Sequence, residues 1–177
     1  VDSVLDSGER VQFAHHRVLL VSRPDRLQVT TTGDQRNVSV WKDGETITVL
    51  DRDQGVYGQL VDPGNIDDMM DMLWLEYDIE VPLADLLSAD PYGILMRGVK
   101  SGRYLGVHMV DAVPSHHLVF SRADIDFQLW IREEGNPVPT KLLITYKDIP
   151  GEPSYTTYIR GGERVEALAR QASARPR

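Results

Sequence analysis

The sequence contains no cysteine, which excludes disulfide bonds and thiolate metal sites. This absence does not fix the compartment, because an exported protein can also lack cysteine. No stretch approaches the roughly 18 uninterrupted apolar residues that a membrane-spanning helix needs, so we expect no transmembrane segment. The chain starts at Val1 without a basic segment followed by an apolar one, so we expect no signal peptide in it.

Basic residues are scarce outside the C-terminal end of the chain. The net charge is -8, although five of the 19 Lys and Arg residues lie in the last 18 positions. Residues 1–159 therefore hold 14 basic and 25 acidic side chains, a net charge of -11. Such an acidic body argues against binding to a phosphate backbone, so nucleic acid is excluded as an expected partner. We expect the Arg-rich tail, residues 161–177, to be flexible.

The composition is that of a folded globule, with 177 residues, 41% hydrophobic and 26% charged. We expect residues 1–160 to form a single domain. The sequence contains no recognisable nucleophile, metal or phosphate motif. It therefore predicts a protein that is not an enzyme and has no cofactor.

Residues 62–97, called the helical segment below, are the only part of the chain with a clear helical pattern. Apolar residues recur there at three- and four-residue spacing, at Ile66, Met69, Met70, Leu73 and Tyr77. Asn65 is the expected helix cap, and four aspartates oppose the positive end of the helix dipole near this start. Pro82 and Pro91 predict two further short helices, because proline favours the first helical turn.

Strand patterns occupy both sides of the helical segment. Before it, we expect strands at 1–5, 11–21, 27–32, 37–42, 45–50 and 55–61; after it, at 104–111, 116–121, 125–132, 138–147 and 154–159. Asp43-Gly44 is a strong two-residue hairpin signal. The two faces of 11–21 exchange polarity near His15, which predicts a bend or bulge.

Several segments resemble a bacterial family of predicted periplasmic proteins known as DUF2092. They are 116–120 (His-His-Leu-Val-Phe), 124–132 (Asp-Ile-Asp-Phe-Gln-Leu-Trp-Ile-Arg) and 137–147, together with 13–27, 41–48 and 82–91. The resemblance covers roughly residues 4–158. Because that family is placed with the LolA and LolB lipoprotein carriers, it implies a strongly curved antiparallel sheet, an incomplete barrel whose concave face is covered by short helices. It also implies a periplasmic or envelope location and assigns no catalytic residue.

The same resemblance implies that an acyl chain or similar apolar ligand is held between the sheet and the helices. Thioether side chains adapt to ligands of varied shape, so methionines of the helical segment are natural pocket residues. We expect the pocket to be lined by Met69, Met70, Leu73, Trp74, Tyr77, Leu86, Phe127 and Leu129. The alternative is that these side chains simply fill the core, as apolar helical stripes do by default.

Two arginines are candidates for binding a lipid headgroup. Arg23 and Arg26 flank Pro24-Asp25 and could hold a phosphate through forked hydrogen bonds. The simpler interpretation is a local ion pair with Asp25 in a turn.

Four histidines could suggest a metal site, namely His15, His16, His116 and His117. Adjacent strand residues point to opposite faces, so neither pair can chelate an ion from one side, and a mixed site requires the two strands to be neighbours. We therefore expect no metal.

The sequence thus favours a non-enzymatic envelope protein that carries a lipid, a lipoprotein acyl chain or another apolar molecule. The alternative is a protein-interaction module of the same fold with a filled core. Unpaired sheet edges also allow a homodimer in either case.

Overall fold

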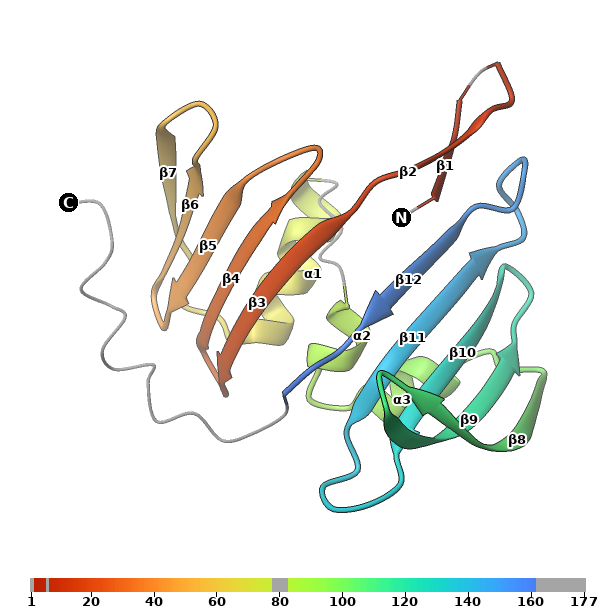
Figure 1. Cartoon of the computed structure of the whole chain (residues 1–177). Helices are drawn as coiled ribbons and strands as arrows, with labels where there is room; N and C mark the ends of the chain where they lie inside the picture. Colours follow the sequence, from red (N-terminus) through yellow and green to blue (C-terminus); the bar gives the residue numbers. More distant parts are fainter. Residues whose placement is uncertain (1, 6, 78–82, 162–177) are drawn as a thin grey trace. The chain divides into compact units, whose positions relative to one another are not determined.

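The computed structural model describes residues 2–5, 7–77 and 83–161, which form two compact units (Figure 1). The first unit contains residues 14–95, and the second contains residues 2–13 and 96–161. The expectation of a single domain over 1–160 stays a prediction. Of the tail expected at 161–177, all but Gly161 lies outside the described residues.

The first unit is built on a five-stranded antiparallel meander, with its strands in chain order. Tight turns connect the strands, and Gly44 adopts the positive φ of 100° that a non-glycine residue avoids, which confirms the predicted Asp43-Gly44 hairpin. The strands are β3 (His15–Ser22), β4 (Arg26–Gly33), β5 (Val38–Asp43), β6 (Thr46–Asp51) and β7 (Val56–Val61).

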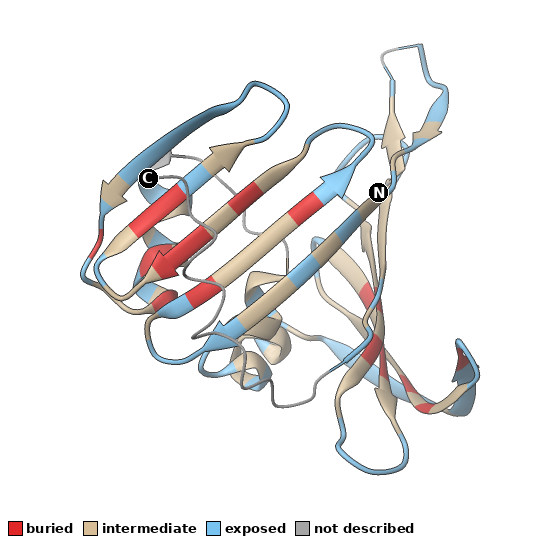
Figure 2. Ribbon diagram, turned by 60° about the vertical axis from the view of Figure 1, so that its left-hand side comes forward, coloured by how far each residue is buried: buried red, intermediate tan, exposed pale blue. Residues whose placement is uncertain are grey.

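Three short helices follow β7, as the helical pattern and the prolines predict. They are α1 (Ile66–Tyr77), α2 (Ala84–Leu87) and α3 (Pro91–Met96). Pro91 is the first residue of α3, whereas Pro82 lies outside the described residues. Helix α1 packs on one face of the meander, where Leu27 and Ile47 form a buried core with Ile66 and Met69 of the helix. Figure 2 marks buried positions on several strands of this sheet.

The second unit contains another five-stranded antiparallel sheet, in the order β12-β11-β10-β9-β8, and a two-stranded ribbon of β1 and β2. Ser154 of β12 donates a hydrogen bond of 2.6 Å to Asp2 of β1. The elements are β1 (Asp2–Val4), β2 (Arg10–Gln12), β8 (Ser101–Val110), β9 (Val113–Ser121), β10 (Ile125–Arg132), β11 (Pro139–Tyr146) and β12 (Ser154–Tyr158).

The antiparallel class with a few short helices is confirmed, but the described strands do not form one continuous sheet. They divide into two five-stranded sheets and a ribbon, and no pairing among them closes either sheet. The strand expected over 11–21 is wrong in one respect, since it breaks at Phe13 and Ala14 into β2 and β3. The break comes just before His15, where the change of polarity between the faces predicts a bend.

Candidate functional site

The face of the first sheet that α1 covers presents two parallel rows of side chains. Paired residues of neighbouring strands share a face, so the strand register defines each row. The first row is Val21, Leu27, Lys42, Ile47 and Leu60; the second is Leu19, Val29, Val40, Val49 and Gly58. Apart from Lys42 and Gly58, every member is a large apolar residue, so this face is suited to pack against an apolar surface.

The middle of the first row is covered by the N-terminal half of α1, whereas Val21 at its β3 end is 37% exposed. Ile66 and Met69 are 0% and 1% exposed, and they pack on Leu27 and Ile47. This burial arises because the two helix residues lie three positions apart and therefore share one side of the helix. At this end of α1 the expected pocket residue Met69 is a core residue.

The second row is covered less completely. Val29 and Val40 are partly buried against the core, whereas Val49 is 40% exposed. At Gly58, opposite Val49, an added Cβ atom would meet no heavy atom within 4 Å. An apolar strip with open space at its β7 end therefore continues from the filled part of the core.

Burial also decreases along α1 from its first turn to its last. Met70, Met72 and Leu73 are partly buried against the core, but Trp74 and Leu75 are 56% and 78% exposed. Trp74 lies one turn beyond Met70 on the helix surface. Trp74 is thus not a core residue, and the second half of α1 keeps apolar area that the described chain does not cover.

A buried ion pair fixes the beginning of the helical segment to the sheet. The ammonium nitrogen Nζ of Lys42 donates to Asp62 Oδ2 at 2.7 Å and to the Asp62 carbonyl oxygen at 2.8 Å. The Lys42 side chain is 0% exposed, so its charge must be paired within the protein. The Asp62 amide also donates to the carbonyl of Glu45 at 2.8 Å, which holds this end of the segment on the β5–β6 hairpin.

Asn65 caps α1, as predicted. Its side-chain oxygen accepts hydrogen bonds from the amides of Asp67 and Asp68, at 2.8 and 3.1 Å. The Asp68 carboxylate in turn accepts the Asn65 amide at 3.0 Å, the reciprocal arrangement of a capping box. Three backbone donors at the helix start are therefore satisfied by side chains.

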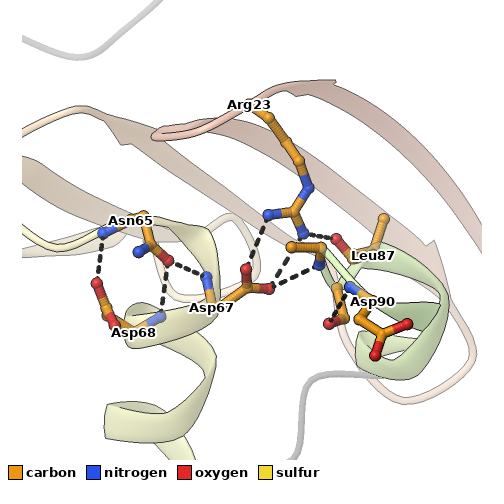
Figure 3. A network of polar contacts seen from close by, with 8 residues as sticks. Arg23, Asn65, Asp67, Asp68, Leu87 and Asp90 are labelled. Carbon is orange, nitrogen blue, oxygen red and sulfur yellow. Dashed lines mark hydrogen bonds and ion pairs between the residues drawn. The ribbon is translucent and has the colours of Figure 1, made fainter. Parts of the chain in front are cut away.

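Arg23 joins the β3–β4 turn to the helical segment (Figure 3). Its guanidinium donates to both carboxylate oxygens of Asp67, at 2.9 and 3.1 Å, and to the Leu87 carbonyl. Asp67 also accepts the Ala89 amide at 3.2 Å. The hydrogen bonds from Arg23 hold the pKa of Asp67 below its ordinary value, and burial opposes them only in part.

The predicted local pair of a flanking arginine with Asp25 is wrong for Arg23, because its guanidinium reaches the helix instead. A ligand phosphate would have to replace Asp67 at Arg23. Arg26 is exposed, and the register pairs it with Asp43, on the sheet face opposite to α1. The two arginines thus do not converge on one group.

The remaining expected pocket residues are distributed over both units. Leu86 is half-buried in α2 of the first unit, and the side chain of Tyr77 lies outside the described residues. Phe127 and Leu129 are 2% and 7% exposed on β10 of the second unit. The structure therefore brings together Met69, Met70, Leu73 and Trp74 on α1, and the rest of the set stays a prediction.

A polar network occupies the second sheet. His108 Nδ1 lies 2.9 Å from His117 Nδ1, and His117 Nε2 lies 2.9 Å from Gln128 Oε1. The His117 ring stacks on Trp130 with centroids 4.0 Å apart, and Lys141 Nζ lies 4.5 Å from the Trp130 centroid. His108 was not among the histidines singled out from the sequence, because no spacing signal relates it to His117.

Beside this network, one face of the second sheet forms a polar hollow of about 360 Å³. Asp126, one of its lining residues, accepts a hydrogen bond from Lys147 at 2.8 Å. Hydrogen bonds from Lys147 and Ser121 keep the pKa of Asp126 below its ordinary value. The lining residues are Ser101, Gly102, Arg103, Val119, Phe120, Ser121, Asp126, Gln128 and Thr145. This hollow is not the apolar pocket that the sequence predicts.

The family of the chain follows from comparison with family models. Residues 1–162 match the model described as predicted periplasmic protein (DUF2092). The chain belongs to the DUF2092 family. The resemblance that the sequence indicates is confirmed, and the family description places this DUF2092 protein in the periplasm.

The DUF2092 chain was also compared with curated proteins and with solved structures. No curated protein matches it. Among solved structures, the chain is similar to the lipoprotein LppX of Mycobacterium tuberculosis, with 12% identity, a TM-score of 0.42 and 82% of each chain covered. At this level the likeness supports no further statement about the chain.

The described residues of this DUF2092 protein were searched for membrane-spanning helices and for clusters of metal ligands. Among these residues, no helix has the length and apolar character needed to cross a membrane. The same residues contain no group of three or more His, Cys, Asp or Glu side chains placed to hold a metal ion. Among the described strands, β3 pairs with β4, and β9 pairs with β8 and β10, so the pairing of neighbouring strands that a mixed histidine site needs is not found in either sheet.

Proposed function

We propose that this periplasmic protein is not an enzyme and that it binds a lipid, a lipoprotein acyl chain or another apolar molecule between the first sheet and α1. The ligand would lie along the second row of the sheet face, beside the C-terminal half of the helix. The incomplete LolA-like barrel implied by the family resemblance, with the helices on its concave face, is part of this proposal. Leu86 of the first unit remains a candidate pocket residue within it, and Phe127, Leu129 and Tyr77 stay predictions from the sequence.

The observation that carries the proposal is the uneven coverage of one continuous apolar face. Ile66 and Met69 cover Leu27 and Ile47 in the middle of the first row, which are 3% and 2% exposed, whereas Val49 and Trp74 keep 40% and 56% of their surface exposed. Apolar surface removed from water contributes about 25 cal/mol per Å². An acyl chain that covers Val49, Gly58 and Trp74 therefore gains binding free energy without displacing the filled core.

The methionine side chains of α1 next to the core favour a ligand of variable shape. Met70, Met72 and Leu73 are partly buried against the core of the first unit. Methionine has three rotatable bonds and a polarizable sulfur, so it adapts to ligands at low cost. The helix start is meanwhile fixed by the Lys42–Asp62 and Arg23–Asp67 pairs, which allows the second half of α1 to move without loss of its anchor.

Mass spectrometry of organic extracts from the purified protein, together with uptake of a fluorescent fatty acid, tests the proposal. We expect a bound lipid in the extracts and saturable uptake of the dye. The absence of both results would contradict the proposal.

A pair of variants on β7 localises the ligand. In Gly58→Leu the new side chain fills the open space beside Val49 and should weaken uptake of the fatty acid. Gln59→Leu adds an apolar side chain on the other face of the same strand, where Gln59 contacts Thr48, and should leave uptake unchanged. Equal uptake by both variants would show that the ligand lies elsewhere.

The alternative function is a protein-interaction module, and edge strand β8 is the observation that favours it. Tyr104, Leu105, Val107 and Met109 of this strand are all exposed. An exposed apolar edge can pair with a second copy of the chain. Light scattering would support a homodimer if the mass doubles with rising concentration and if Val107→Lys prevents it; a constant monomer mass would count against it.

A further inference from the structure

The pair of histidines on the second sheet has the arrangement of two metal ligands. His108 of β8 pairs with Ser115 of β9, so it shares a face with His117, two residues farther along β9. The two Nδ1 atoms face each other at 2.9 Å. Neither histidine is part of the apolar site on the first sheet.

The contact of His117 with Gln128 determines where the proton of His117 lies. Gln128 Oε1, an atom that only accepts hydrogen bonds, lies 2.9 Å from His117 Nε2, so that nitrogen carries the proton. His117 Nδ1 therefore presents a lone pair toward His108. An imidazole that donates one ring N–H to a fixed acceptor and offers the other nitrogen is the usual state of a metal-binding histidine.

The surroundings hold His117 still and leave His108 accessible. His117 is 7% exposed and is stacked on Trp130. His108 is exposed on β8, an edge strand, so water can complete the coordination of an ion. The ammonium of Lys141 over the Trp130 ring weakens the attraction of a cation, which makes this a site of modest affinity.

The two nitrogens are close enough for one metal ion to bind both of them after a small movement. With metal–nitrogen bonds of about 2.0–2.1 Å, ligands at a tetrahedral angle lie about 3.3–3.4 Å apart, whereas ligands at right angles lie about 2.9 Å apart. The observed 2.9 Å is the length of the N–H···N hydrogen bond between the two rings, so the exposed His108 ring must turn for both lone pairs to point at one ion. Tetragonal coordination by nitrogen and oxygen is typical of Cu(II) and Ni(II), and Cu(II) binds nitrogen ligands more tightly.

We propose that His108 and His117 bind one Cu(II) ion through their Nδ1 atoms, with solvent in the remaining positions. The ion takes the place of the proton that His108 Nδ1 donates to His117 Nδ1, and this same proton is transferred through solvent to the exposed Nε2 of His108, so no proton is released. No third His, Cys, Asp or Glu of the described residues joins the pair. The site is therefore open and exchanges its ion readily.

Calorimetric titration of the tag-free, full-length protein with Cu(II) tests the site. We expect one Cu(II) per chain, with weaker binding of Ni(II) and Zn(II). His108→Ala should lower the Cu(II) affinity at least about tenfold, and Gln128→Leu should lower it by about 10- to 100-fold through the loss of the outer hydrogen bond. Because His108 is exposed, its replacement should leave the fold intact.

His116→Ala is the matched control. His116 is adjacent to His117 on β9 but lies on the other face, where its Nδ1 contacts the Tyr104 hydroxyl at 3.0 Å. Its replacement should leave the Cu(II) affinity unchanged. Electron paramagnetic resonance of the bound Cu(II) should show coupling to two imidazole nitrogens. Undiminished affinity in His108→Ala, or coupling to an amine nitrogen instead, would overturn the proposal.

Discussion

Lys42 and Asp62 form an ion pair with a nitrogen–oxygen distance of 2.7 Å, at the point where the helical segment leaves the first sheet. Lys42 belongs to the first row of the sheet face, between Leu27 and Ile47. The positive charge of Lys42 therefore lies within the apolar core on which α1 packs. The pair determines where the helix begins on the sheet, which in turn determines which part of the apolar face the helix covers.

Removal of one member of this pair should destabilise the protein strongly. In Lys42→Met, Asp62 loses its partner in a site that is 8% exposed, and we expect a loss of about 3–5 kcal/mol in the free energy of unfolding. Urea denaturation followed by circular dichroism measures this change. Arg160→Ala, which breaks the exposed pair with Asp111, is the control and should cost less than about 1 kcal/mol. A similar small loss in Lys42→Met would contradict the role of the pair.

Met69 and Trp74 should respond differently to truncation, although both lie on α1. Met69→Ala empties a site that is 1% exposed and should cost about 2–5 kcal/mol. Trp74→Ala should cost much less, because the side chain is 56% exposed, and it should instead reduce fatty-acid uptake. Thermal unfolding and dye titration of the two variants separate these effects. A large loss of stability in Trp74→Ala with unchanged uptake would show that Trp74 is structural.

Asn65→Ala should destabilise the start of α1 by about 1 kcal/mol, because two backbone donors lose their acceptor. Asn65→Asp should retain most of the stability, since aspartate caps helices equally well. Urea denaturation of both variants provides the comparison. Equal losses in the two variants would mean that the amide group of Asn65 acts in some other way.

The pair of Arg23 with Asp67 should contribute to acid sensitivity. The pKa of Asp67 is lowered in the folded protein by the hydrogen bonds from Arg23, so the folded state favours the charged carboxylate. This contribution is fully present above the ordinary aspartate pKa of about 3.9 and is lost as the pH falls through the lower folded value.

Unfolding curves measured between about pH 2 and 7 check this expectation. Asp67→Asn should be less stable than the parent protein near neutral pH, and the difference should shrink as the pH falls below the ordinary aspartate value. The carboxyl resonance of Asp67 should also titrate below that value in nuclear magnetic resonance spectra. A pH-independent difference between the two proteins would contradict the assignment.

Local signals explain why so much of the fold could be predicted. The Asp43-Gly44 turn, the Asn65 cap and the start of α3 at Pro91 each depend on residues close together in the sequence. The alternation of polarity likewise identifies most strands, and its change near His15 indicates the break between β2 and β3. The division of the strands into two five-stranded sheets and a ribbon depends on pairing between distant residues, which the periodicity of the sequence does not specify.

The candidate site could be predicted only in part, for the same reason. The apolar spacing in α1 identifies Met69 and Leu73, but not which turn of the helix stays uncovered. Arg23 is followed by Pro24-Asp25, which suggests a local pair, whereas the actual partner, Asp67, is 44 residues away. The His108–His117 contact depends on a register shift in β8 between Tyr104 and Val107, which no spacing rule anticipates.

Photo-crosslinking with a diazirine-bearing fatty acid tests the central claim most directly. After irradiation and proteolysis, mass spectrometry should locate the label on the second half of α1 and on the strand residues around Val40 and Val49, and an excess of unlabelled fatty acid should abolish it. Label confined to other parts of the chain, or no competable label at all, would contradict an apolar site between the first sheet and α1.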